Sequence, residues 1–180
     1  MLPFQLRPIT VADLDALVAL DSDPEVMRFI NGGQPTPRAL CAEVLLPRML
    51  AAANRPGLGF FAVESPEGAF MGWVHLRLDS FEPAWAEIGY RLARPFWGQG
   101  VATATSRLLA RRAFDELGFD VVSARTMPEN LASRRVMEKV GLHETGRFVF
   151  PARALPGLNL PEVPGVLYTL RRDDRPAELR

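Results

Sequence analysis

The chain has a single cysteine, Cys41, among its 180 residues, and it has no cluster of residues with metal-ligand spacing. An internal disulfide therefore cannot form, and no metal cofactor is expected. The N-terminal segment MLPFQLRPIT lacks the pattern of a signal peptide, and no apolar run is long enough to span a membrane. These absences predict a protein of the cytoplasm that does not enter a membrane.

The sequence also lacks an excess of either charge, because 21 Lys and Arg residues balance 21 Asp and Glu residues. A surface for broad nucleic-acid binding is therefore not expected, although the count leaves room for a local basic patch. Hydrophobic residues make up 48% of the chain, which is enough for a sizeable core. With no internal repeat or low-complexity segment apparent, we expect one domain over residues 1–180.

Apolar periodicity predicts a mixed α/β fold with a hairpin near its start. Helices are expected after Thr10, from Pro24, from Pro37 with a kink at Pro47, and after Gly100. A further helix is expected over 131–140. The proline-rich segment 151–164 should be a loop, and the charged tail 171–180 should be frayed. Strands are expected over 4–9, 59–64, 69–78, 87–92, 121–126, 143–150 and 166–170.

The most informative stretch is EIGYRLARPFWGQGVA, from Glu87 to Ala102. It begins as an alternating strand, turns through Gly98-Gln99-Gly100 and continues directly into a helix. Glycines let a ligand approach the backbone, and the start of a helix offers free N–H groups, so such a turn can bind phosphate. The nucleotide motif GxxxxGK[ST] and the third glycine of the dinucleotide fingerprint are both absent. Taken alone, the turn is a weak signal, because tight turns from a strand to a helix use glycine for chain geometry more often than for ligands.

Two longer segments are more specific, WGQGVATATSRLLARRAFDELGF and RTMPENLASRRVMEKVGL. Together with DPEVMRFINGG they resemble the GNAT acetyltransferase superfamily, and most of all its ribosomal-protein N-acetyltransferase branch. The resemblance implies a mixed central sheet of about seven strands with a splayed central strand pair and flanking helices. It also implies acetyl-CoA as acyl donor, and a primary amine as acceptor, on a small molecule or a protein N-terminus. A monomer or homodimer is expected.

The phosphate motif of the superfamily, [Q/R]-x-x-G-x-[G/A], ends here at Gly100 and Ala102, whereas its first position is Trp97, a departure that the branch shares. The resemblance implies that N–H groups across 99–103 hold the pyrophosphate and that the splayed strand holds the pantetheine arm. An ordinary sheet without a gap is the alternative. The predicted cofactor-binding residues are Tyr90, Arg91, Leu92, Trp97, Gly98, Gln99, Gly100, Val101, Ala102, Thr103, Asn130 and Ser133.

Glu87 is the candidate general base. It lies where several members of the family keep a glutamate that removes the proton of the amine, usually through water. Partial burial would raise its pKa toward neutrality, whereas a solvent-facing position is the alternative. His75, in the neighbouring strand, could face the same cleft but is more often a structural residue type. Phe29 and Phe148 could line the acceptor cleft or equally belong to the core.

The second motif of the family, N-x-x-S-x-x-x-x-E-K-x-G, places Asn130 and Ser133. Asn130 is a good helix N-cap, and the motif implies that its amide also meets the cofactor. Many relatives carry a tyrosine near the end of this motif to protonate the leaving thiolate, but Met137 stands there. The resemblance to the ribosomal-protein branch implies Ser133, one turn earlier, as the candidate acid, with a serine bonded to a preceding carbonyl as the alternative. Arg134, Arg135 and Lys139 could reach the ribose phosphate or form a solvated face.

The sequence thus predicts an N-acetyltransferase that transfers an acetyl group directly in a ternary complex, with Glu87 and Ser133 as catalytic residues. Because Cys41 lies outside the motifs, no covalent acyl-enzyme is implied. Acceptor specificity should depend on the loop-like stretches 31–37 and 152–164. The missing tyrosine at Met137 leaves open a second class of protein, a non-catalytic sensor that binds acyl-CoA.

Overall fold

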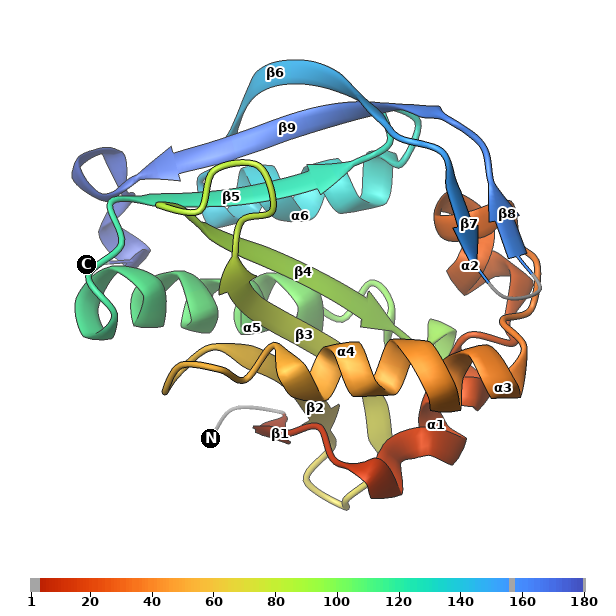
Figure 1. Cartoon of the computed structure of the whole chain (residues 1–180). Coiled ribbons are helices and arrows are strands. Elements are labelled where there is room, and N and C mark those ends of the chain that lie inside the picture. Colours follow the sequence, from red (N-terminus) through yellow and green to blue (C-terminus); the bar gives the residue numbers. More distant parts are fainter. Residues whose placement is uncertain (1–3, 156–157, 180) are drawn as a thin grey trace.

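The computed structural model of the chain describes residues 4–155 and 158–179. A seven-stranded mixed sheet, in the order β1-β2-β3-β4-β5-β9-β6, forms its centre, and Figure 1 shows how strongly this sheet curves. Only the β4–β5 pair is parallel; the other neighbours are antiparallel. The strands are β1 (Gln5–Pro8), β2 (Gly59–Glu64), β3 (Phe70–Leu78), β4 (Ala86–Leu92), β5 (Val121–Thr126), β6 (His143–Phe150) and β9 (Val163–Arg171).

Helices cover both faces of the sheet (Figure 1). Helices α1 (Leu14–Leu20) and α4 (Leu46–Ala51) contact β3 and β2, whereas α5 (Val101–Arg111) and α6 (Leu131–Val140) pack behind β4 and β5 on the opposite face. Helix α2 (Pro24–Asn31) follows α1 along the chain. In the described part of the chain, no helix combines the length and the apolar character that a membrane span requires.

The helix boundaries follow local signals in the sequence. The side chain of Asp23 accepts a hydrogen bond from the backbone of Glu25, and Pro24 follows in the first turn of α2. The expected kink at Pro47 takes the form of a π-helical segment, Cys41–Leu45, that joins α3 (Arg38–Leu40) to α4. A wider turn suits this position because proline has no N–H to donate.

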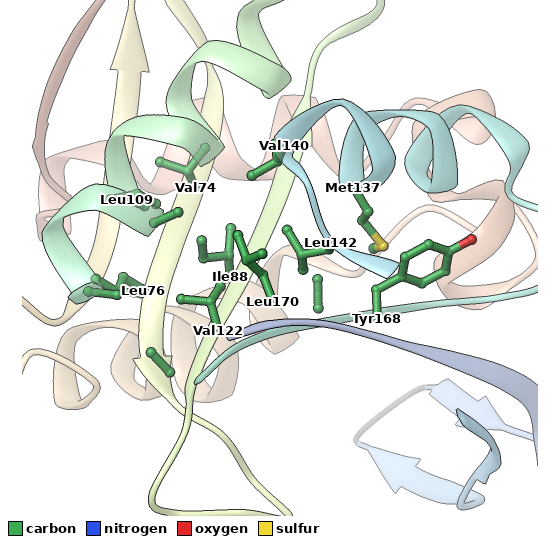
Figure 2. Packing of buried hydrophobic residues seen from close by; sticks show 14 of the residues in the cluster. Val74, Leu76, Ile88, Leu109, Val122, Met137, Val140, Leu142, Tyr168 and Leu170 are labelled. Carbon is green, nitrogen blue, oxygen red and sulfur yellow. The ribbon is translucent and has the colours of Figure 1, made fainter. Parts of the chain in front are cut away.

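The main hydrophobic core lies between the sheet and the helices α5 and α6 (Figure 2). Met137 points into this cluster and is only 4% exposed, so the position where relatives carry a tyrosine is here part of the core. Tight packing of this kind fixes the β4 strand and the start of α5 relative to each other. The cluster includes Val74, Leu76, Ile88, Leu109, Val122, Val140, Leu142, Tyr168 and Leu170.

The predicted loop over 151–164 is wrong. A separate two-stranded sheet, β7 (Arg153–Leu155) with β8 (Leu158–Leu160), lies within it, and β9 begins at Val163 rather than 166. Pro164 pairs with Val149 of β6, but the ladder from β9 to β5 starts only at Val166. At Pro164, β9 is therefore paired with β6 but not with β5. On the unpaired side, the missing N–H of proline removes no hydrogen bond of the ladder.

The predicted fraying of the tail is also wrong. Two short 3₁₀ turns, Arg172–Asp174 and Ala177–Leu179, fold the tail back against the domain. Leu179 is fully buried in the main core, and the guanidinium of Arg111 donates a hydrogen bond to the carbonyl of Glu178. Leu179, in a tail that is mostly charged, thus provides buried apolar surface that docks it.

This docking can be tested with Leu179→Ala. Removing a fully buried leucine side chain should lower the free energy of unfolding by about 2–5 kcal/mol. The same change at Leu131, which is 55% exposed, is the control and should cost far less. Urea denaturation of both variants measures the difference; equal losses would show that the tail is frayed after all.

Candidate active site

The two central strands, β4 and β5, separate soon after they begin to run side by side. Their parallel ladder contains only the pairs Ala86–Val122 and Glu87–Ser123. Beyond these pairs β4 follows β3 and β5 follows β9, and Figure 1 shows the two strands diverging. The expected splayed pair is confirmed, and an uninterrupted sheet is excluded. We call the space between the separating strands the wedge, with its apex at Glu87 and Ser123.

Side chains of β4 alternate between the two faces of the sheet. Ile88 and Leu92 belong to the main core, with Tyr90 packed against it, whereas Arg91 lies on the face that α1 and α4 cover. There the Arg91 guanidinium stacks over the Trp73 ring at 5.1 Å and pairs with Asp21 at 2.5 Å. Strand β4 thus presents charged groups to one face and apolar groups to the other.

Glu87 is buried at the apex of the wedge, with 8% of its surface exposed, so the alternative of a solvent-facing position is excluded. The guanidinium of Arg77, directly across the β3–β4 ladder, lies 2.9 Å from Oε2 as an ion pair without hydrogen-bond geometry. Burial raises the pKa of Glu87 above its ordinary value, and the charges of Arg77 and Arg125 oppose this rise. A buried carboxylate with a raised pKa is suited to accept a proton.

His75 is a structural residue. Its ring lies between Trp73, stacked at 5.8 Å, and Phe60, edge-on at 4.8 Å. Burial lowers the pKa of His75 well below its ordinary value, and neither ring nitrogen has a hydrogen-bond partner among the described residues. Gly89 leaves room for this ring, because a Cβ there would lie 2.5 Å from it. The neutral imidazole packs between aromatic rings, as a structural residue would, but its nitrogens are not hydrogen-bonded within the described structure.

A buried charged cluster that the sequence did not indicate stabilises the apex. Asp79 accepts hydrogen bonds at 2.5 Å from the Ser123 hydroxyl and the Arg125 guanidinium, and from the backbone N–H groups of Phe81 and Glu82. Burial opposes the charge of Asp79, but these hydrogen bonds outweigh it and hold the pKa below its ordinary value. Ser123 is also the partner of Glu87 in the ladder, so this cluster fixes the place where the strands part.

Two aromatic candidates for the acceptor cleft differ in position. The Phe148 ring lies over Gly165 and 5.8 Å from the guanidinium of Arg125, whose other aromatic neighbour is Phe81 at 4.8 Å. Phe148 is therefore close to the charged cluster at the apex. Phe29 is half-buried on α2 beneath the guanidinium of Arg28. Neither residue belongs to the buried core.

The glycine turn after β4 is open to an incoming ligand. Gly98 and Gly100 have φ angles of 72° and 79°, and a Cβ at either position would meet nothing within 4 Å. No side chain caps α5, so the N–H groups of its first turn, at 101–103, have no acceptor within the helix. Such a turn offers an anion several N–H donors and the positive end of a helix dipole.

Trp97 connects this turn to the strand before it. Its indole N–H donates a hydrogen bond of 2.7 Å to the carbonyl of Leu92, the last residue of β4. The ring is nevertheless 47% exposed, so Trp97 does not pack beneath the turn, whereas Phe96 packs against the core. The Gln99 amide also holds the turn, through a hydrogen bond to the carbonyl of Pro95.

The second motif folds as the sequence predicts. Asn130 caps α6 by accepting a hydrogen bond from the N–H of Ser133, and Gly141 ends the helix at a φ of 102°. The Ser133 hydroxyl lies 2.9 Å from the hydroxyl of Tyr90, and no hydrogen bond joins it to a carbonyl of the preceding turn in the described structure. Ser133 is thus held at the wedge rather than bonded within its own helix.

The basic residues of α6 have different environments. The Arg134 guanidinium donates hydrogen bonds to the Tyr168 hydroxyl, the Pro128 carbonyl and the Glu144 carboxylate. Through these contacts Arg134 connects α6 to β6 and β9. Because its guanidinium already has these partners, a role at the ribose phosphate is not favoured. Arg135 and Lys139 are exposed, as a solvated helix face requires.

Comparison with known proteins identifies a family model and relatives that match the sequence of this chain. Residues 4–143 match the family model described as Acetyltransferase (GNAT) domain. The FsC-acetyl coenzyme A-N(2)-transacetylase of Aspergillus fumigatus is 36% identical over 151 residues, which is 80% of this chain but only 64% of that protein. The putative ribosomal N-acetyltransferase YdaF of Bacillus subtilis is 38% identical over 82 residues, 45% of this chain and 44% of that protein.

Solved structures share the fold. A protein described as a putative acetyltransferase has a TM-score of 0.76 at 26% identity, covering 99% of this chain and 88% of its own. Mycobacterium smegmatis RimJ in complex with CoA-disulfide has a TM-score of 0.76 at 21% identity, covering 98% and 85%. Spermidine N-acetyltransferase from Vibrio cholerae, in complex with CoA and spermine, has a TM-score of 0.73 at 18% identity, covering 96% and 97%. At these low identities, RimJ and the spermidine N-acetyltransferase are similar to this chain in fold alone.

The protonation of Glu87 can be tested through stability. A carboxyl whose folded-state pKa is raised stabilises the fold below its unfolded pKa, and this contribution is lost as the pH rises through the folded pKa. Relative to Glu87→Gln, the wild type should therefore lose stability from about pH 4.5 upward. Urea denaturation across this range measures the difference between the two proteins.

Glu67→Gln is the control for this experiment. A hydrogen bond from Ser65 lowers the pKa of Glu67, so the wild type should gain stability relative to that variant as the pH rises. A Glu87 profile with the same sign as the Glu67 profile would mean that the Glu87 carboxylate is not destabilised by burial.

Proposed function

As a member of the acetyltransferase (GNAT) family this chain is an acyltransferase, and we propose that it transfers the acetyl group of acetyl-CoA directly to a primary amine. The transfer takes place in a ternary complex, within one domain over residues 1–180 that acts as a monomer or homodimer. The observation that supports this proposal most is the wedge itself. Glu87 provides a buried carboxylate at the apex of the wedge. An open glycine turn follows β4, the strand that forms one side of the wedge.

The residues present fit the cofactor. A chain of amide groups such as pantetheine can pair with β4 over residues 88–92, where β5 no longer does. The open turn at Gly98 and Gly100 and the N–H groups at 101–103 suit the pyrophosphate. Bound in this way, the cofactor would supply an acyl group activated as a thioester. Two structures that share the fold, RimJ and spermidine N-acetyltransferase, were solved with CoA-disulfide and with CoA, which supports CoA as the cofactor of this fold.

Glu87 acts as the general base in this proposal. A protonated amine cannot attack a thioester, so a group at the site must accept its proton, directly or through a water molecule. The Glu87 side chain lies on the face that α1 and α4 cover, the same face as Arg91 and Arg77. The acceptor therefore approaches from that face, and the segments 31–37 and 152–164 determine its specificity.

Ser133 stabilises the leaving thiolate. Its hydroxyl lies at the wedge, and its position in the first turn of α6 places it near the positive end of the helix dipole. Met137 is buried in the core and offers no donor, so Ser133 takes the role that a tyrosine has in many relatives. The base and the donor thus lie on opposite faces of β4.

The acceptor class rests on the names of the relatives. Spermidine and ribosomal proteins, which name two of the similar proteins, both carry amines. A purified chain should therefore release CoA thiol when a suitable amine is added. A panel of polyamines, amino acids, aminoglycosides and N-terminal peptides, with thiol release as the readout, identifies the acceptor. Binding of acetyl-CoA without turnover of any amine would instead support a non-catalytic sensor.

The glycine turn can be tested with Gly100→Asp. The new carboxylate would face the anion and its Cβ would occupy the open cradle, so affinity for acetyl-CoA should fall strongly. Gly118→Asp is a matched control, because Gly118 also has a positive φ, of 77°, and open space before it. Both variants carry the strain of a left-handed residue. Calorimetry should show loss of binding only in the first; equal affinities would rule out this turn as the phosphate site.

The role of Glu87 can be tested kinetically with Glu87→Gln. The amide keeps the size of the side chain but cannot accept a proton, so kcat/KM should fall by roughly 100-fold or more near neutral pH. The loss should shrink at high pH, where more of the amine is already deprotonated. The exposed Glu67→Gln should behave as wild type. An unchanged pH–rate profile in Glu87→Gln would leave Glu87 with a structural role only.

A further inference from the structure

The hydroxyl of Tyr90 connects β4, one side of the wedge, to the first turn of α6. Tyr90 extends from β4, and its hydroxyl lies 3.0 Å from the carbonyl oxygen of Ser133 and 2.9 Å from the Ser133 hydroxyl oxygen. These contacts lie beyond the last paired residues of β4 and β5, in the part of the wedge that has no ladder. The proposed function uses the backbone of β4 at this point and assigns nothing to this side chain.

Two arrangements of protons are possible at this contact. If Tyr90 donates to the Ser133 carbonyl, the Ser133 hydroxyl can donate to the Tyr90 oxygen, and its proton is then directed away from any ligand. If Tyr90 donates to the Ser133 hydroxyl oxygen, the proton of Ser133 is free to point elsewhere. A serine hydroxyl rotates freely and donates only once, so the tyrosine decides where that single donor is directed.

We propose that Tyr90 is a positioning residue that directs the hydroxyl proton of Ser133 toward a sulfur anion bound in the wedge. This inference rests on the proposed function, because the anion is the thiolate of CoA. The chain of donors runs from Tyr90 to Ser133 to sulfur. No covalent bond forms or breaks at either residue, and the proton lost by the amine still goes to Glu87.

Tyr90 acts in this chain as a donor of a hydrogen bond and not as an acid. Burial raises the pKa of Tyr90 to about 12, so its hydroxyl keeps its proton. Donation to Ser133 polarises the serine hydroxyl, and hydrogen bonds in series to an anion strengthen one another. The Asn130 cap holds the backbone of Ser133 in place while its hydroxyl turns.

The test begins with Tyr90→Phe, which keeps the ring that packs against the core and removes only the hydroxyl. One lost hydrogen bond in the chain should lower kcat by about three- to tenfold. The KM for acetyl-CoA should change little, because the backbone contacts of β4 remain. Wild-type kcat in a folded Tyr90→Phe enzyme would overturn the inference.

A double-mutant cycle with Ser133→Ala separates positioning from a structural tie. The backbone carbonyl at position 133 persists in Ser133→Ala, so Tyr90 can still bond to it. A purely structural role predicts that Tyr90→Phe lowers kcat by the same factor in both backgrounds. The inference predicts no further loss of kcat in the Ser133→Ala background, even where Tyr90→Phe lowers the melting temperature there.

A binding measurement makes the test independent of turnover. Wild type should bind CoA more tightly than desulfo-CoA, which lacks the sulfur, and this preference should grow as the pH rises and the thiol ionises. Tyr90→Phe should reduce the preference several-fold while leaving the affinity for desulfo-CoA unchanged. If wild type turned over no amine, the proposed function would fail, and this preference could still be measured. An equal preference in both proteins would overturn the inference alone.

Discussion

The short ladder between β4 and β5 is the constraint on which the rest of the site depends. Two residue pairs hold the strands together, and the buried charge of Asp79 secures the second of them through Ser123. An ion pair as deeply buried as Asp79–Arg125 is costly unless its remaining hydrogen-bonding capacity is used. Here two backbone N–H groups and the Ser123 hydroxyl satisfy the carboxylate, so the cluster fixes one geometry for the apex.

Local signals account for the parts of the fold that the sequence predicted correctly. The ends of α6 follow from Asn130 and Gly141, and the start of α5 follows from the glycine turn, since each signal acts within a few residues of its effect. The loop and tail predictions failed because long-range packing overrode local composition. Pro164 can lie in a strand because β9 is not paired with β5 there. Leu179 docks because its side chain packs into the main core.

The site shows the same division between local and long-range information. Family motifs placed Glu87, Asn130 and the glycine turn, because each lies in a continuous and recognisable segment. Contacts between segments carry no such signal, and Tyr90 and Ser133 are 43 residues apart, as Asp79 and Ser123 are 44 apart. From the sequence alone, a tyrosine in an alternating strand resembles a core residue. Its hydroxyl contacts Ser133 only because β4 and β5 separate.

Alternation along β4 allows one strand to serve a base and a donor without joining them. A carboxylate and a hydroxyl on the same face would hydrogen-bond to each other, and the carboxylate would then hold the donor needed by the leaving group. Glu87 and Tyr90 avoid this because their side chains leave β4 on opposite faces, toward Arg77 and toward Ser133. Arg77 and Arg125 oppose the effect of burial on Glu87, which keeps its ionised form accessible, while burial keeps Tyr90 protonated. In the proposed function, the backbone of β4 therefore separates proton acceptance by Glu87 from anion stabilisation by Ser133.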